Sequence, residues 1–187
     1  YNRLSEKKLD GDYELSFLWI GVNDVYSKLL SVQAQPVAEN HEEFQSYYEK
    51  VLDLVVQSSK QVVTVTPAIV GEKIDNTSNN EIKELNILIQ SITSKYSNVS
   101  FIDIQSAFIN HLLEVNSSDY ISTKVLSVMM DVLFYKKPSK IDKKSKERGL
   151  HLTLDGIHLN STGAQLVADI YAAKIEHFLE NEHHEVQ

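Results

Sequence analysis

Residues 15–22 read Leu-Ser-Phe-Leu-Trp-Ile-Gly-Val, an almost continuous apolar run. Such a run predicts a strand that is buried on both faces, as strands in the middle of a parallel sheet are. Here it is the first strand of the chain, and too little sequence precedes it to supply a neighbour on its other side. Because an apolar strand with an open edge is prone to aggregate, we expect one or two further strands upstream of Tyr1, or from a partner.

Two more short apolar runs, at residues 62–66 and 99–104, alternate with segments of helical period at residues 41–58 and 81–96. A last helix is expected over residues 161–179, capped by Ser161 or Thr162. Strands that alternate with such helices predict βαβ units around a parallel sheet. The length of 187 residues fits one domain. We therefore expect a single α/β domain over residues 1–187 that is incomplete at its N-terminus.

An extra segment at residues 119–148 separates the third predicted strand from the last helix. Residues 119–134 have a helical period, and residues 136–148 are expected to form a basic loop in which six lysines and Arg148 face only Asp142 and Glu147. In a chain of net charge −8 this is a local reversal of sign. The loop could be a lid or could steer an anionic substrate. The more common alternative is a solvated surface loop.

Composition excludes several classes of function. The net charge of −8 argues against general nucleic-acid binding, which depends on neutralising phosphates. No apolar run approaches the roughly 20 residues that a membrane span needs. The chain has no cysteine, so disulfides, thiol catalysis and cysteine-based zinc sites are excluded. We expect neither a metal nor an organic cofactor; compartment and oligomeric state stay open.

Asp155-Gly156-Ile157-His158 is the strongest candidate for chemistry. The acid three residues before the histidine can accept a hydrogen bond from one imidazole nitrogen and fix the tautomer. The other nitrogen is then free to take a proton from a serine hydroxyl. A lone histidine is more often structural, but His158 differs from the other histidines in having this acid, a glycine for a tight turn and a helix start beside it.

Gly21-Val22-Asn23-Asp24 follows the first predicted strand. The Asn23 side-chain amide could donate a hydrogen bond to the oxyanion of a tetrahedral intermediate. In that interpretation Gly21 lets the backbone come close and Asp24 braces the loop. The alternative is that Asn23 only stabilises a turn, as asparagines after strands often do.

These two stretches, in this order, resemble the SGNH or GDSL hydrolases, a flavodoxin-like group of serine esterases and acylhydrolases. The family block Gly-x-Asn-Asp is matched by residues 21–24, and the block Asp-x-x-His-Leu-Asn is matched by Asp155 and residues 158–160. Residues 66–72 and 147–155 are also similar to segments of esterases in this group, some of which remove acetyl groups from carbohydrates. The resemblance implies a three-layer α/β/α fold and a small-molecule or carbohydrate ester as substrate. It also implies His158 as base, oriented by Asp155, with Asn23 at the oxyanion.

The nucleophile of that family is the serine of a Gly-Asp-Ser turn after the first strand, and it cannot be placed in this sequence. Gly11-Asp12-Tyr13 has tyrosine at the serine position and precedes a strand, and there is no Gly-x-Ser-x-Gly elbow. The resemblance therefore implies a hydrolase whose serine lies upstream of residue 1. One alternative is a truncated or degenerate relative that binds without catalysis. A second, an unrelated nucleotide-binding or signalling module, is disfavoured because no Gly-rich phosphate loop follows a predicted strand.

Overall fold

A computed structural model of the chain describes residues 4, 6, 9, 11–30 and 37–185. Its sheet has three parallel strands in the order β1-β2-β3. Their bounds are Tyr13–Trp19 for β1, Ser59–Val65 for β2 and Val99–Ile102 for β3. In register, Phe17 lies beside Val63, which lies beside Ser100. Within the described residues, β1 pairs only with β2.

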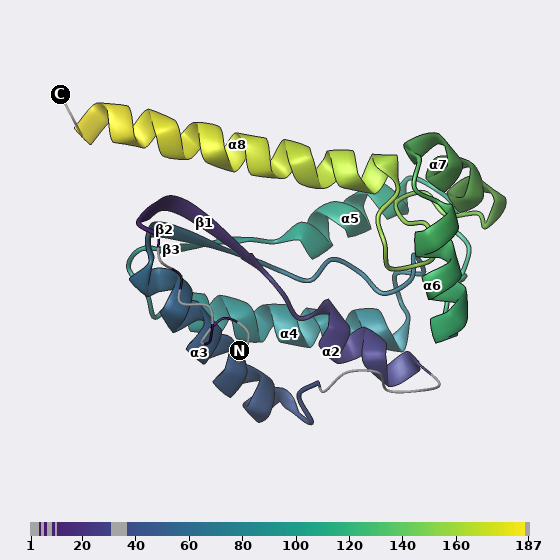
Figure 1. The fold of residues 1–187 in the computed structure, drawn as a ribbon, viewed down its shortest axis with the longest axis horizontal. Coiled ribbons are helices and arrows are strands. Elements are labelled where there is room, and N and C mark those ends of the chain that lie inside the picture. The colour runs from purple at the N-terminus through teal and green to yellow at the C-terminus, as the bar shows by residue number, and fades with distance from the viewer. Residues whose placement is uncertain (1–3, 5, 7–8, 10, 31–36, 186–187) are drawn as a thin grey trace.

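Helices cover both faces of the sheet, and Figure 1 shows α3 and α4 on one side with α5 and α8 on the other. The helices are α2 (Val22–Tyr26), the 3₁₀ helix η1 (Ser27–Leu29), α3 (His41–Gln57), α4 (Thr77–Thr93), α5 (Ile104–Leu113), α6 (Val125–Phe134), α7 (Pro138–Glu147) and α8 (Ser161–Glu185). The predicted alternation of strands and helices is thus confirmed.

Two hydrophobic cores lie on opposite faces of the sheet, because side chains alternate in direction along a strand. Leu18 and Val62 pack in the core under α3 and α4, together with Leu52 and Ile89. The neighbouring strand residues Val63 and Val65 belong to the other core, which α5 and α8 cover with residues that include Phe108 and Val167. The three-layer α/β/α fold with a parallel sheet is confirmed.

The first strand differs from its prediction in length and in burial. It ends at Trp19, whereas the apolar run continues to Val22. The chain turns at Gly21, which has φ +119° and leaves no room for a side chain, since a Cβ would lie 2.9 Å from Pro67 Cγ. Helix α2 begins directly afterwards. Leu18 is buried, but Trp19 is 39% exposed, as residues of an edge strand often are.

The segment at residues 119–148 is more helical than predicted. Residues 119–124 precede α6 without being helical, so the expected helix is shorter than the pattern suggested. The prediction of a basic loop at residues 136–148 is wrong, because α7 occupies most of it. Pro138 lies in the first turn, where its missing N–H costs nothing. Ser145 faces the interior while most of the lysines stay exposed.

The cap of α8 also differs from the prediction. Asn160 caps this helix: its side-chain oxygen accepts from Gly163 N at 3.0 Å, and its carbonyl accepts from Ala164 N at 2.9 Å. Ser161 and Thr162 are instead the first residues of the helix. Among the described residues, no helix combines the length and apolarity that a membrane crossing needs.

Candidate active site

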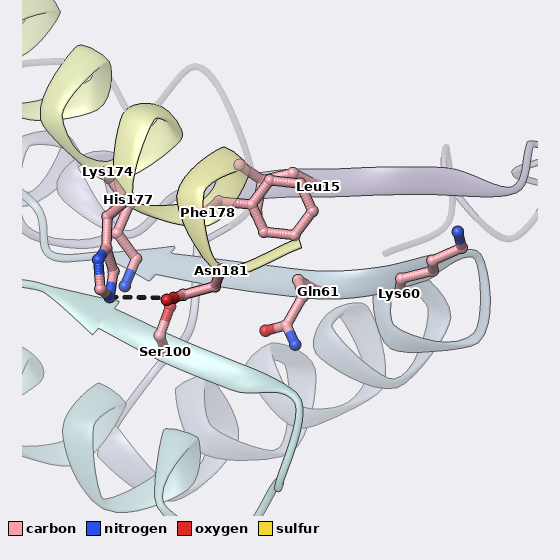
Figure 2. Close-up of a pocket in the computed structure, with 8 residues that line it drawn as sticks. All are labelled: Leu15, Lys60, Gln61, Ser100, Lys174, His177, Phe178 and Asn181. Atoms are coloured by element: carbon pink, nitrogen blue, oxygen red, sulfur yellow. Dashed lines mark hydrogen bonds between the residues drawn. The ribbon is translucent and has the colours of Figure 1, made fainter. Parts of the chain in front are cut away.

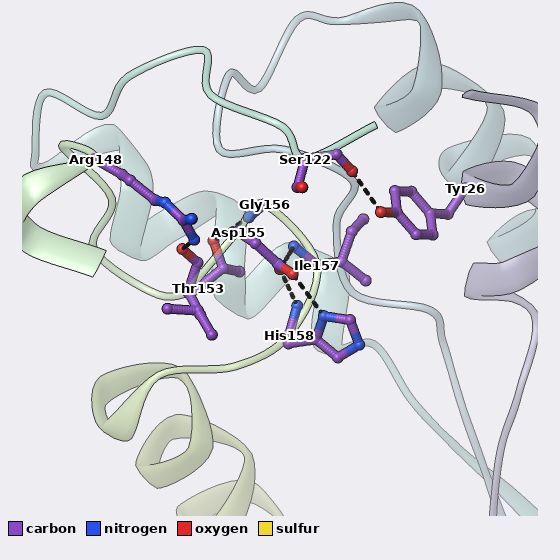
Figure 3. A network of polar contacts seen from close by, with 9 residues as sticks. Tyr26, Ser122, Arg148, Thr153, Asp155, Gly156, Ile157 and His158 are labelled. Carbon is purple, nitrogen blue, oxygen red and sulfur yellow. Dashed lines mark hydrogen bonds and ion pairs between the residues drawn. The ribbon is translucent and has the colours of Figure 1, made fainter. Parts of the chain in front are cut away.

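Asp155 and His158 lie on the loop between α7 and α8, beside the segment that follows the carboxyl end of β2 (Figure 3). Asp155 Oδ2 is 2.8 Å from His158 Nδ1. The second oxygen, Oδ1, accepts from the backbone N–H groups of Ile157 and His158 at 3.0 and 2.8 Å. The Asp155 side chain is fully buried, whereas 47% of the His158 side chain is exposed. The predicted acid–histidine pair therefore exists in the fold.

Two opposing effects determine the pKa of the Asp155 carboxyl. Burial raises it, because the charged form loses solvation. The hydrogen bond and charge of His158, with the two backbone N–H donors, outweigh burial and hold the pKa of Asp155 below its usual value. An ionised Asp155 accepts the Nδ1–H, which leaves Nε2 of a neutral His158 as the basic nitrogen.

Gly156 makes the turn that lets one carboxylate reach two backbone N–H groups and the ring of His158. Its φ is +92°, a conformation that favours glycine. A Cβ there would lie 2.9 Å from the Tyr120 carbonyl oxygen. The Gly156 carbonyl accepts from Gly71 N at 2.7 Å, and its N–H donates to Thr153 Oγ1 at 3.1 Å. The turn is fixed on both sides.

Glu72 is the residue that sequence analysis missed. It is 2% exposed and lies next to Gly71, after the carboxyl end of β2. Its carboxylate accepts five hydrogen bonds. Four come from the loop: His151 N to Oε2 (2.7 Å), and Leu152 N (2.8 Å), Thr153 N (2.7 Å) and Thr153 Oγ1 (2.8 Å) to Oε1. The fifth comes from Ser117 Oγ to Oε2 at 2.8 Å. One signal in the sequence could have pointed to Glu72. It is an acid directly after the apolar residues 68–71, at a place where no helix needs a cap.

The same loop is also held from α7. Ser145 Oγ donates to the Thr153 carbonyl at 2.6 Å. The amide of Asn160 donates both to Ser145 Oγ (2.7 Å) and to the His151 carbonyl (2.9 Å). Arg148 Nη1 donates to the Leu154 carbonyl at 2.9 Å. These bonds satisfy buried backbone groups, which would otherwise destabilise an irregular loop.

The Gly21–Asp24 stretch lies at the carboxyl end of β1, where the sequence predicted an oxyanion donor. Asp24 Oδ1 accepts from Ala38 N at 3.0 Å, so this side chain holds the chain after η1. Asn23 is exposed in the first turn of α2. Its side chain makes no hydrogen bond to any described residue. The role of Asn23 therefore stays a prediction.

Tyr26 connects the two predicted stretches (Figure 3). From α2, its hydroxyl donates to the Ser122 carbonyl, and Ser122 N donates to the Asp155 carbonyl at 2.9 Å. Burial, followed by the negative charge of Asp155, raises the pKa of Tyr26 to about 12. The helix that carries Asn23 is thus joined to the backbone of the acid that orients His158.

A cavity of about 300 Å³ lies elsewhere, between the C-terminal half of α8 and the sheet (Figure 2). Its lining includes Lys60, Lys174 and His177, and the His177 ring lies 3.3 Å from Asn181 Nδ2. It contains neither Asp155 nor His158, so it is not the candidate active site. Within the part of the chain that the structure describes, no three acidic or histidine side chains gather as a metal site would require.

Solved structures similar to this chain are esterases and hydrolases. An acetyl xylan esterase, AlAXEase, is 26% identical with a TM-score of 0.62, over 92% of this chain and 73% of its own. An α/β hydrolase from the metagenome of Lake Arreo is 17% identical with a TM-score of 0.57, over 92% of this chain and 62% of its own. An acetylxylan esterase from Geobacillus stearothermophilus is 16% identical with a TM-score of 0.55, over 88% and 60%.

The chain therefore spans less than two thirds of the length of the last two structures. None of the curated protein sequences matches it. The model of one protein family, described as GDSL-like Lipase/Acylhydrolase, matches residues 1–170. With Asp155 and His158 paired on the loop before the last helix of an α/β/α fold, the chain belongs to the GDSL-like lipase/acylhydrolase family.

Proposed function

We propose that this protein is a serine ester hydrolase that uses a Ser-His-Asp triad, in which Asp155 and His158 are the acid and the base. The observation that carries the proposal is the 2.8 Å contact between Asp155 Oδ2 and His158 Nδ1, with the carboxylate buried and the imidazole half exposed. A base held in one tautomer by a buried acid is what nucleophilic catalysis by serine requires.

The proposed reaction begins when a serine hydroxyl attacks the ester carbonyl carbon and its proton passes to His158 Nε2. The tetrahedral intermediate expels the alcohol, which takes that proton, and an acyl-enzyme is left. Water then attacks the acyl-enzyme with His158 again as base, and the carboxylic acid is released. Asn23 is proposed to donate to the oxyanion in both steps. The serine is the one that the family pattern places upstream of residue 1.

We further propose a carbohydrate acetyl ester as the substrate class. The support is that several similar structures are acetylxylan esterases. Three of these structures are catalytic mutants in which a serine, an aspartate or a histidine is replaced by alanine, and that histidine follows the aspartate by three positions. Asp155 and His158 have the same spacing.

The test combines a serine-directed fluorophosphonate with an assay of acetate release from acetylated xylooligosaccharides. In a protein that carries the proposed upstream serine, we expect the label on that serine, outside residues 1–187, as located by mass spectrometry, and we expect acetate release. A folded protein that takes no label and releases no acetate would contradict the proposal and favour the non-catalytic binding module. Labelling without acetate release would retain the hydrolase and reject the carbohydrate substrate.

A further inference from the structure

We propose that Glu72 is a positioning residue for the Asp155–His158 pair. This inference rests on the proposed function only in treating that pair as the acid–base pair. The Glu72 carboxylate bonds Ser117 and residues 151–153, so its action on Asp155 and His158 runs through the loop that it holds. Glu72 has no role as a proton carrier toward substrate, because it is 2% exposed and its carboxylate is surrounded by five hydrogen-bond donors.

The carboxylate suits this position because all five of its partners are donors. An ionised carboxylate has two acceptor oxygens and no hydrogen to place against another N–H. Three backbone N–H groups in a row, those of residues 151–153, point to it. In an irregular loop these N–H groups have no partners of the kind that a helix or sheet supplies. If they were buried without an acceptor, their hydrogen bonds would be unsatisfied. Glu72 thus determines the path of the backbone before Asp155.

A relay continues from this carboxylate into the turn at Gly156. Thr153 Oγ1 donates to Glu72 Oε1 at 2.8 Å and accepts from Gly156 N at 3.1 Å. The Thr153 hydroxyl therefore has one orientation, set by Glu72, and its lone pair holds the N–H directly after Asp155. Figure 3 shows Thr153 and Gly156 close to Asp155.

Gly71, the residue next to Glu72, also holds the turn at Gly156, and the two residues together are called the clamp. Gly71 N donates to the Gly156 carbonyl at 2.7 Å. Two consecutive residues after β2 therefore hold the catalytic turn at two points, Gly71 at the carbonyl of Gly156 and Glu72, through Thr153, at its N–H. Asp155 and His158 are only three residues apart, so the conformation of the turn between them decides whether the Asp155 carboxylate can reach His158 Nδ1. A rigid sheet end thereby fixes a loop that follows 80 residues later.

The test is an NMR titration of the His158 ring in the isotope-labelled chain, which needs no ester hydrolysis. The reference is Asp155→Asn, in which the carboxylate that stabilises the imidazolium is gone and the His158 midpoint falls. We expect Glu72→Gln to move the His158 titration midpoint at least halfway from the wild-type value toward that of Asp155→Asn. The reason is that the amide NH₂ of the glutamine would face the N–H donors that the carboxylate accepts from. Ser117→Ala is the matched control: it removes the one partner of Glu72 outside the loop, and His158 should titrate as in wild type.

A folded Glu72→Gln protein with a wild-type His158 titration would overturn the proposal. If Glu72→Gln does not fold, Thr153→Val decides, since it keeps the shape of the side chain and removes only the relay hydroxyl. A shift of the His158 midpoint toward Asp155→Asn then supports the clamp, and a wild-type midpoint rejects it. If the protein does not hydrolyse esters but Glu72→Gln still shifts the His158 midpoint, the proposed function is rejected and the positioning role is retained.

Discussion

In the loop around Asp155 and His158 the candidate acid is itself hydrogen-bonded, whereas in the turn at residues 21–24 the candidate oxyanion donor, Asn23, makes no hydrogen bond to the described residues. Asp155 is buried and makes three hydrogen bonds within its own turn. Asn23 is exposed and makes none to the described residues, while Gly21 and Asp24 fix the chain around it. The difference matches the two proposed roles, because a base is oriented before the substrate arrives, whereas an oxyanion donor stays available for a group that the substrate brings.

The largest expected effect is that of His158→Ala in a form of the protein that hydrolyses esters. Loss of the base should lower kcat by roughly 10⁶-fold, the scale seen when the histidine of a triad is removed, with the fold intact. Hydrolysis of p-nitrophenyl acetate measures it. His151→Ala is the matched control, because His151 lies on the same loop but its ring is hydrogen-bonded to the Asn116 carbonyl and not to Asp155. Near wild-type turnover without His158 would remove it from the mechanism.

Asn23→Ala should separate activity from stability most clearly. An exposed side chain that bonds none of the described residues contributes little to folding, so the free energy of unfolding should stay within about 0.5 kcal/mol of wild type. If the amide donates to the oxyanion, kcat should fall by roughly 10²- to 10³-fold. Urea unfolding and steady-state kinetics on the same preparation test both parts. Unchanged kcat would reject the oxyanion role and leave Asn23 as a turn residue.

Gly156→Ala and Gly21→Ala compare the two backbones directly. Both glycines have positive φ, and strain of this kind costs about 1–3 kcal/mol. The Gly156 substitution should be the more damaging, since its Cβ would meet a backbone oxygen, that of Tyr120, at 2.9 Å. The Cβ at Gly21 would meet side-chain atoms instead, Pro67 Cγ at 2.9 Å and Phe44 Cζ at 3.3 Å. Denaturant unfolding measures the free energy of unfolding of both variants. Equal losses would show that it does not matter here whether the added Cβ meets a backbone or a side-chain atom.

Tyr26→Phe breaks the connection between the two regions. It removes the hydrogen bond to the Ser122 carbonyl while keeping the ring in the core, so the free energy of unfolding should fall by about 1 kcal/mol. Tyr47→Phe is the control, because Tyr47 is 46% exposed and should leave stability unchanged. Equal unfolding midpoints for the two variants would show that the connection carries no stability.

The smallest effect concerns pH, because burial and hydrogen bonding shift the pKa of Asp155 in opposite directions. The net shift is downward, so the stabilisation from this carboxylate is complete above its ordinary pKa of 3.8 and is lost as pH falls through the lower folded value. The stability advantage of wild type over Asp155→Asn should therefore shrink from about pH 5 to pH 3. Urea unfolding across that range measures it; an advantage that grows on acidification would contradict the sign.

The family resemblance implied the α/β/α layers, while the sequence alone predicted the order of strands and helices and the Asp155–His158 pair. These features are local, since helical and strand periods span a few residues and the acid and histidine are only three apart. The helix at α7 escaped prediction, because a run of lysines has no apolar stripe and the helix is defined by Pro138 and by the packing of Ser145.

Only the tertiary structure revealed what holds the site. Glu72 meets residues 151–153 across about 80 positions of sequence, and Tyr26 meets Ser122 across 96. No local pattern encodes such contacts, because they depend on which loop ends the fold brings to the same edge of the sheet. The pairing of Asp155 with His158 was therefore readable from the sequence, whereas the hydrogen bonds that hold the loop around them come from buried groups far away along the chain.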